Sequence, residues 1–485
     1  MTAKCVMVLG TSSGAGKSWL ATALCRHYAR QGLKVAPFKA QNMSNNARVV
    51  ASAQGQGEIG SAQYFQALAA RAVPEVRMNP LLLKPEADTR SQVVLLGQVD
   101  AELSAAPWRG RSEKVWPRIA QALAELREDY DVIVIEGAGS PAEINLMASD
   151  IVNLRIARVA DARCLLVTDI DRGGAFAHLY GTWALLPEAD RMRLAGFVLN
   201  KFRGDATLLA PAPEQLQQLT GVPTVAVLPM WWQHGLPEED GVFDDRSRSH
   251  GAVERSVAVV AYPRLSNLDE FQPLKNVPGL RLVWARSPAE LAGADWIVLP
   301  GSKHTSSDLA WLRAQGLDLA IAGHAARGGA VLGICGGLQM LGEALIDPHG
   351  IDGNAPGLGL LPLVTLFEPD KTVRQTTACF GELNGAWSAL SGVAVSGYEI
   401  HHGQTAQHPA MAAAGDIARE VLPGLAWQNP AGNVLGCYLH GLFEDPAVLR
   451  ALFGATVPTL DAVFDGLADY LERHCAPGVL DALIA

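Results

Sequence analysis

The segment spanning residues 4–18 constrains the fold most, because a short apolar run leads into a glycine-rich loop ending in Gly-Lys-Ser. A buried strand, such a loop and a helix form the phosphate-binding loop of nucleotide-binding α/β domains. Five residues separate Gly10 from Gly16, one more than in the usual pattern. We expect Lys17 to neutralise phosphate charge and the Ser18 hydroxyl to hold Mg²⁺. A dinucleotide-binding turn is disfavoured because GxGxxG is absent.

The remainder of the chain alternates short β-branched runs with amphipathic stretches, the pattern of parallel α/β domains. Residues 1–235 are predicted to form a doubly wound nucleotide-binding domain. Residues 236–253 are dense in charge and turn formers, which predicts a linker. A second α/β domain is predicted over residues 254–446. Residues 447–485 have the pattern of helices, and we expect this extension to pack on the second domain.

Composition excludes several classes of function. With 485 residues, a net charge of −10 and no basic block, the chain is not expected to bind nucleic acid. Its apolar runs fall far short of the roughly 20 residues that cross a bilayer. We expect no cleavable leader, no membrane partner and a cytoplasmic location. The seven cysteines include no CxxC pair, so neither a disulfide framework nor a zinc site is favoured.

Three polar residues stand where predicted parallel strands end, at the edge where open α/β sheets bind ligands. Lys39 follows the run VAPF, and Glu136 follows DVIVI. Glu136 is a candidate metal ligand, directly or through water. Asn200 begins NKFRGD and is a candidate for reading a nucleotide base, although an ordinary polar turn explains it equally well.

A second reactive site is predicted where the run AVLG leads into GICGGLQ. Glycines on both sides of Cys335 permit the sharp strand-to-helix turn that exposes a nucleophile. His440 is the favoured base, and His401 and His402 are its rivals. Backbone N–H groups of the LPGSKHT loop and of Gly336 are candidates for an oxyanion hole.

These motifs resemble two known groups. The GICGGLQ elbow, the LPGSK loop and the late His440 resemble class I glutamine amidotransferase domains. The lengthened GTSSGAGKS loop, Lys39 and EGAGS resemble dethiobiotin synthetase-like ATP-dependent ligases. Their order resembles the cobyrinate and cobyric acid synthases of cobalamin biosynthesis, and PFKAQNMSNNA, EGAGSPAEINL and NKFRGD look like the cobyric acid branch of that family.

The resemblance implies an enzyme that amidates the b, d, e and g carboxylates of adenosylcobyrinic a,c-diamide, with glutamine, ATP and Mg²⁺. It implies the nucleophile Cys335, the base His440 and oxyanion contributions from Gly301 and Gly336. The implied nucleotide and metal residues are Thr11, Gly14, Gly16, Lys17, Ser18, Lys39, Asn200, Glu136 and, as a second metal carboxylate, Glu58. Corrinoid contacts are expected from Asn42, Ser44, Asn45 and Asn145. Assembly into a homo-oligomer is left open.

One position departs from the amidotransferase pattern. The residue two places after the histidine is usually a Glu that orients it, but here it is Leu442. Glu399, Glu444 or a backbone carbonyl are the candidates to replace that Glu.

Two alternatives to this function stay open. One is cobyrinate a,c-diamide synthase or another ATP-dependent amidoligase. The other is a P-loop positioning ATPase with a degenerate second domain, which predicts a membrane-seeking helix or a basic DNA-binding face; the sequence contains neither.

Overall fold

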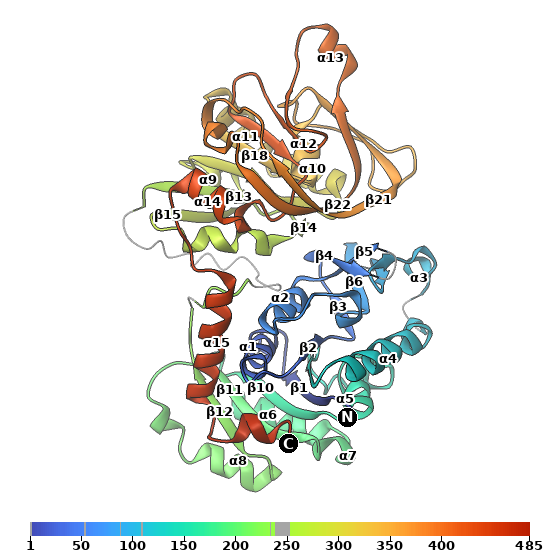
Figure 1. Cartoon of the computed structure of the whole chain (residues 1–485), viewed down its shortest axis with the longest axis vertical. Helices are drawn as coiled ribbons and strands as arrows, with labels where there is room; N and C mark the ends of the chain where they lie inside the picture. The colour runs from blue at the N-terminus through green and yellow to red at the C-terminus, as the bar shows by residue number, and fades with distance from the viewer. Residues whose placement is uncertain (1, 53–54, 88, 108–109, 233, 238–252) are drawn as a thin grey trace.

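The computed structural model describes residues 2–52, 55–87, 89–107, 110–232, 234–237 and 253–485. Two α/β units lie one above the other in Figure 1, each built on its own largely parallel sheet. We call residues 2–237 the first unit and residues 253–453 the second unit. The predicted fold class is confirmed. Most of the predicted linker lies outside the described residues.

The first unit is centred on a six-stranded sheet whose paired strands are all parallel. Its order is β12 (Thr224–Pro229), β11 (Leu194–Phe202), β10 (Arg163–Asp169), β1 (Lys4–Gly10), β9 (Val132–Glu136) and β2 (Val35–Phe38). Because β9 and β10 flank β1 on opposite sides, the loop after β1 lies where the strand order reverses. That is where open α/β sheets bind ligands.

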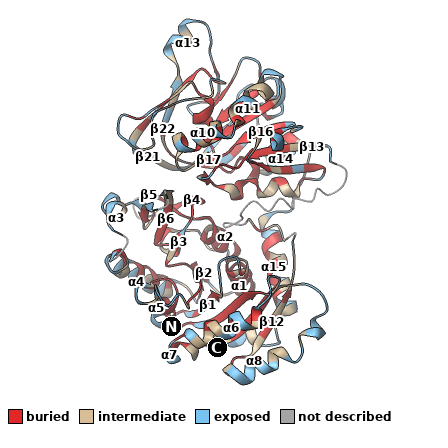
Figure 2. Ribbon diagram, turned by 180° about the vertical axis from the view of Figure 1, so that it is seen from behind, coloured by how far each residue is buried: buried red, intermediate tan, exposed pale blue. Residues whose placement is uncertain are grey.

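The core of the first unit has two layers, one on each face of the sheet, because successive side chains of a strand such as β1 point to opposite faces. Val6 and Val8 belong to a buried cluster with α1, whereas Met7 and Leu9 belong to a cluster with α4. The strands are accordingly buried on both faces (Figure 2). The longer helices around this sheet are α1 (Lys17–Arg30), α2 (Ser61–Ala69), α4 (Arg111–Asp129), α5 (Leu154–Ala160), α6 (Ala175–Leu185) and α8 (Ala212–Thr220).

Shorter strands of the first unit face the second unit (Figure 1). One sheet contains β3 (Gln41–Met43), β6 (Leu81–Ala87), β7 (Arg90–Leu95) and β8 (Gln98–Val99), in that order. An antiparallel hairpin is formed by β4 (Ala47–Ser52) and β5 (Gly55–Gly60). Both strands of this hairpin contact β21, and β4 also contacts β22. The hairpin therefore lies at the boundary between the two units.

The second unit has a seven-stranded sheet in the order β15 (Leu280–Ala285), β13 (Arg255–Val260), β16 (Trp296–Leu299), β18 (Ala330–Ile334), β25 (Val434–Cys437), β24 (Ala426–Gln428) and β23 (Arg419–Leu422). The first five strands are parallel and the last two are antiparallel additions. A long hairpin of β21 (Leu363–Cys379) and β22 (Ala394–Gln407) extends from this core. The principal helices of the second unit are α10 (Thr305–Ala314), α11 (Leu317–Ala326) and α12 (Gly336–Leu341).

The C-terminal helices divide between the units, which corrects our expectation that they all pack on the second one. Helix α14 (Pro446–Phe453) packs on the second unit, but α15 (Leu460–His474) lies along α1 of the first unit (Figure 1). Phe464 and Leu467 are buried in one cluster with Leu20 of α1, and Arg26 of α1 pairs with Asp465. None of the helices in the described ranges is long and apolar enough to span a bilayer.

Candidate active sites

The phosphate loop connects β1 to α1 in the first unit, as predicted. Gly16, which precedes α1, has a φ of 104°, a backbone conformation that residues other than glycine rarely adopt. The Lys17 ammonium donates to the carbonyl oxygens of Ser12 (2.9 Å) and Gly139 (3.2 Å), so it lies across the loop. Together with the backbone N–H groups at the start of α1, it makes a site suited to phosphate.

Glu136, at the end of β9, is the centre of a buried polar network beside this loop. Its Oε1 accepts hydrogen bonds from the Ser18 hydroxyl and the Lys39 ammonium, both at 2.9 Å, and its Oε2 accepts one from Gln66 at 2.5 Å. Burial opposes ionisation of Glu136, but Lys39 and these hydrogen bonds outweigh it and lower the pKa of the carboxyl group. The structure therefore brings Ser18, Lys39 and Glu136 together.

The same network fits Mg²⁺. Hydroxyl and carboxylate oxygens are the ligands that Mg²⁺ prefers, with phosphate oxygens completing its shell. Gln66 Oε1 is buried and has no hydrogen-bond partner within the described part of the chain, so the pocket still has an unused acceptor. No three His, Cys, Asp or Glu side chains of the described residues group as a metal site.

Two hydrogen bonds tie the phosphate loop to other strands of the sheet, one from Asn200 of β11 and one from Thr11 at the start of the loop. Asn200 Nδ2 donates to the carbonyl oxygen of Ala15 at 2.9 Å. The hydroxyl of Thr11 donates to that of Thr168 at 2.9 Å, which ties the start of the loop to β10. Asn200 thus lies beside the phosphate loop, and its Oδ1 accepts a hydrogen bond from the backbone N–H of Lys201 at 2.9 Å. Gly14, on the same loop, has a φ of 72°.

Of the residues expected to contact the corrinoid, Asn42 lies nearest to this network. Its Nδ2 donates to Gln63 Oε1 at 3.3 Å, and Gln63 Nε2 lies 3.5 Å from Glu136 Oε2. Gln63 therefore links Asn42 to the Glu136 carboxylate beside the phosphate loop.

The other three corrinoid candidates differ in exposure. Ser44 is buried and accepts a hydrogen bond from the Asn46 backbone. Asn45 Oδ1 is buried, with no hydrogen-bond partner among the residues described. Asn145 is exposed, in a turn after β9.

Glu58 does not join the predicted metal site. Its carboxylate, on β5, pairs with Lys84 (2.7 Å) and with Lys371 of the second unit. Burial raises the pKa of Glu58, but the two lysines outweigh it and bring the value to about 2. Two ammonium groups already compensate this carboxylate, and they would repel a divalent cation. We therefore interpret Glu58 as a residue that connects the two units through Lys371. The expectation that it is a second metal carboxylate is corrected.

Cys335 occupies the predicted elbow between β18 and α12. Its φ of 51° and ψ of −106° are strained for a residue with a side chain, as at other nucleophile elbows. Its backbone N–H donates to the carbonyl oxygen of Cys437 at 2.8 Å, which ties the turn to β25, the neighbouring strand of the sheet. A Cβ on Gly337 would lie 1.9 Å from the carbonyl oxygen of Leu299, so only glycine permits this close approach. The local sequence thus explains the sharp turn that carries the Cys335 thiol, which is itself buried.

The structure brings His440, the favoured base, close enough to Cys335 for the two side chains to interact electrostatically. The Cys335 thiol donates to the carbonyl oxygen of Ile400 at 3.6 Å. His440 Nδ1 lies 3.2 Å from Glu270 Oε1, and both side chains are buried. Burial disfavours the imidazolium, but the charges of Glu270 and Cys335 outweigh it and raise the pKa of His440 to about 10. Cys335, His440 and Glu270 therefore have the arrangement that a nucleophile, its base and an orienting carboxylate require.

Glu270 is the functional residue that the sequence reasoning missed. It replaces the Glu expected at Leu442 but lies 170 residues before His440, in the 3₁₀ segment η4 (Leu268–Asn276). The two proposed substitutes are engaged elsewhere: Glu399 pairs with Arg374, and Glu444 pairs with Arg48. Neither Glu399 nor Glu444 supplies the third member of this group.

The rival histidines make other contacts. His401 Nδ1 lies 2.8 Å from the carbonyl oxygen of Gly403, and its ring stacks on Tyr438. His402 Nδ1 lies 3.2 Å from the carbonyl oxygen of Glu368, and burial lowers the pKa of His402 to about 4. These contacts account for both histidines without a role as base.

The predicted oxyanion loop lies against the elbow. A Cβ on Gly301 would come within 2.8 Å of His440 Cε1, and a Cβ on Gly336 would come within 2.8 Å of the Ser302 backbone nitrogen. Gly301, Ser302 and Gly336 are therefore close neighbours around Cys335 and His440. Backbone N–H groups in such a position suit a developing oxyanion.

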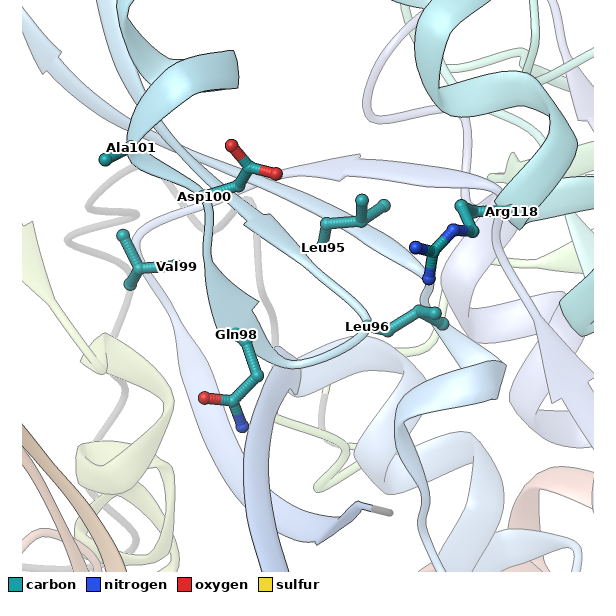
Figure 3. Close-up of a pocket in the computed structure, with 7 residues that line it drawn as sticks. All are labelled: Leu95, Leu96, Gln98, Val99, Asp100, Ala101 and Arg118. Carbon is teal, nitrogen blue, oxygen red and sulfur yellow. The ribbon is translucent and has the colours of Figure 1, made fainter. Parts of the chain in front are cut away.

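A pocket of about 360 Å³ lies elsewhere in the first unit, beside β8 and α4 (Figure 3). It is lined by Leu95, Leu96, Gln98, Val99, Asp100, Ala101 and Arg118. It contains none of the predicted site residues, so the two polar sites described above remain the candidates.

Comparison with known proteins agrees with this division into two sites. Residues 6–233 match the model of the CobQ/CobB/MinD/ParA nucleotide binding domain, and residues 256–448 match that of the CobB/CobQ-like glutamine amidotransferase domain. Cobyric acid synthase of Variovorax paradoxus is 80% identical, with all of both chains covered. That of Acidovorax ebreus is 78% identical, covering all of this chain and 99% of the relative.

The chain belongs to the cobyric acid synthase family. Family membership confirms the resemblance inferred from the motifs and pairs a nucleotide-binding domain with a glutamine amidotransferase domain. It excludes the interpretation of the second unit as a degenerate binding module of a positioning ATPase. In this family the phosphate loop and the Cys335 elbow are two parts of one enzyme.

Proposed function

We propose that the chain catalyses the glutamine-hydrolysing, ATP-dependent amidation of adenosylcobyrinic a,c-diamide to adenosylcobyric acid, at its b, d, e and g carboxylates. The observation that carries this proposal is the presence of two built sites in one chain. The Cys335–His440–Glu270 group suits ammonia release, and the phosphate loop with Glu136 suits carboxylate activation. The curated relatives named cobyric acid synthase support the corrinoid substrate.

At the glutaminase site, the Cys335 thiolate attacks the side-chain carbonyl carbon of glutamine. The oxyanion that forms accepts hydrogen bonds from backbone N–H groups at Gly301 and Gly336. The C–N bond then breaks as the His440 imidazolium donates a proton to the leaving ammonia. Water, deprotonated by His440, hydrolyses the thioester and releases glutamate. Glu270 holds the imidazole in position throughout.

At the amidoligase site, a carboxylate oxygen of the corrinoid attacks the γ-phosphorus of ATP, and ADP leaves. Ammonia then attacks the acyl phosphate carbon, phosphate departs, and the nitrogen loses a proton. Lys17 compensates charge on the transferring phosphoryl group. Mg²⁺, held by Ser18, Glu136 and phosphate oxygens, would supply further positive charge there. Asn42, Ser44, Asn45 and Asn145 are proposed to bind corrinoid amides and carboxylates.

The deciding experiment is mass spectrometry of cobyrinic a,c-diamide incubated with the enzyme, ATP, Mg²⁺ and glutamine. We expect successive replacement of four carboxyl groups by amides. An unchanged substrate with intact ATP would reject the proposal. In a parallel incubation that starts from cobyrinic acid, conversion to the a,c-diamide would identify a cobyrinate a,c-diamide synthase.

We further propose that the enzyme acts in the cytoplasm, where ATP and glutamine are both available. The free thiol that the glutaminase reaction requires also suits a reducing compartment. Whether the chain assembles into a homo-oligomer is a question for sedimentation analysis.

A further inference from the structure

Arg48 lies at the boundary between the units. It comes from β4 of the first unit, yet its side chain is only 2% exposed and its guanidinium pairs with carboxylates of the second unit. One nitrogen donates to Glu444 Oε2 at 2.8 Å, and the other contacts both Glu444 and Asp269. Arg48 therefore compensates a buried carboxylate, Asp269, and a partly buried one, Glu444, that its own unit does not contain.

The backbone around Arg48 binds the same segment of the second unit. The carbonyl oxygen of Ala47 accepts a hydrogen bond from Asn267 Nδ2 at 2.8 Å. Asn46 Oδ1 accepts one from the backbone N–H of Leu268 at 3.0 Å. Three successive residues of the first unit, 46–48, thus hold three successive residues of the second, 267–269.

The next residue of that second segment is Glu270, the carboxylate that orients His440. Its other oxygen accepts a hydrogen bond from the Gly441 backbone at 3.0 Å, which ties it to the base's own loop. Asn267 also donates to the Tyr398 hydroxyl at 2.6 Å, and the Tyr398 ring stacks on His440. The docked segment therefore supports His440 from two sides.

On the opposite side, Arg48 packs against α2 of the first unit. Its guanidinium lies 4.9 Å from the centroid of the Phe65 ring and 5.4 Å from that of Tyr64. Phe65 immediately precedes Gln66, which donates to Glu136 at the phosphate loop. One side chain thus lies between the helix that contacts Glu136 and the segment that carries Glu270.

We propose that Arg48 is a positioning residue of the glutaminase site, supplied by the amidoligase unit of the same chain. It acts through Asp269, Glu444 and the 267–270 segment to hold Glu270 against His440. Glutamine hydrolysis is then efficient only while the two units are docked through residues 46–48. The inference concerns the alignment of His440 and does not depend on the identity of the carboxylate that is amidated.

The test compares Arg48→Met, which removes the charge, with Arg48→Lys, which keeps it. Arg77→Met is the matched control, because Arg77 pairs with Glu75 and Asp129 inside the first unit. Glutamate release and amidation driven by added ammonium chloride are measured for each protein. For Arg48→Met we expect the kcat of glutamine hydrolysis to fall about 10- to 100-fold, as for other small misplacements of catalytic groups.

The KM for glutamine and the ammonia-driven rate should match those of Arg77→Met, because glutamine contacts and the phosphate loop are retained. Arg48→Lys should recover part of the kcat. Equal kcat in Arg48→Met and Arg77→Met would overturn the proposal, as would an equal loss of ammonia-driven amidation in Arg48→Met.

If Arg48→Met does not fold, the variant Asn46→Ala tests the proposal instead. It removes the hydrogen bond to Leu268 without stranding a charge. A lowered glutaminase kcat with unchanged ammonia-driven amidation supports the proposal, and an unchanged glutaminase kcat refutes it.

Discussion

Replacing Glu270 with glutamine tests the reconstructed glutaminase site most directly. The substitution keeps the size of the side chain but removes the charge that lies 3.2 Å from His440 Nδ1. At an effective dielectric constant of about 20, that separation corresponds to about 5 kcal/mol, or roughly 4 pKa units. The rise of the His440 pKa from its ordinary value of 6.5 to about 10 is what remains after burial, which lowers it, is outweighed by this attraction and by that of Cys335.

The direction of the pH effect follows from this shift. Because the folded protein raises the pKa of His440, the ion pair stabilises the fold fully below about pH 6.5 and loses that contribution as the pH rises through about 10. In Glu270→Gln, burial acts unopposed by this carboxylate and the pKa of His440 falls. The imidazolium that protonates ammonia is then lost at lower pH, so the alkaline limb of glutamine hydrolysis moves toward neutrality.

The assay is glutamate release from glutamine across the neutral and alkaline range, with ammonia-driven amidation measured in parallel. We expect kcat for glutamine hydrolysis to fall roughly 10²- to 10⁴-fold, the scale seen when the orienting carboxylate of a catalytic triad becomes an amide. Ammonia-driven amidation should persist. A wild-type alkaline limb in Glu270→Gln, or an equal loss in Glu399→Gln, would refute the role assigned to Glu270.

Three further changes separate the two sites and test the C-terminal docking. Cys335→Ala should abolish glutamine-dependent amidation and leave ammonia-driven amidation intact; product analysis showing loss of both would contradict the division of labour. Lys17→Ala should stop amidation with either nitrogen source, because phosphate charge is left uncompensated, and normal turnover would exclude the assigned ATP site. Phe464→Ala should lower the free energy of unfolding by about 3–5 kcal/mol, the usual cost of truncating a buried aromatic ring. Denaturant melts of that variant and of Leu319→Ala, which alters an exposed side chain, check the value, and equal midpoints would show that α15 adds little.

Both reactive loops could be predicted because their requirements are local in sequence. A phosphate loop and a nucleophile elbow each need glycines at set distances from one polar residue, between an apolar run and a helix. The spacing of those glycines is therefore enough to indicate Lys17, Ser18 and Cys335. Lys39 and Glu136 followed from one topological rule, that parallel strands end at the same edge of a sheet.

The remaining features depend on contacts that no local pattern encodes. Glu270 follows Asn267, Leu268 and Asp269 in a segment with no catalytic spacing, and only the fold brings it to His440. Likewise, the apolar stripe of α15 indicated that the helix packs on something, but both units offer apolar surface. Its ion pairs with Arg26 show which surface it covers.

The position of α15 also bears on how the protein is made. Arg26 and its partner Asp465 are 439 residues apart, so the α1 surface that α15 covers waits for most of the chain to be translated. At about 5–20 residues per second, that interval is roughly 20 to 90 s. During this time the nascent first unit exposes the apolar side of α1 beside the growing second unit. We therefore expect ribosome-bound intermediates stalled before residue 460 to need chaperone protection, which full-length chains would not.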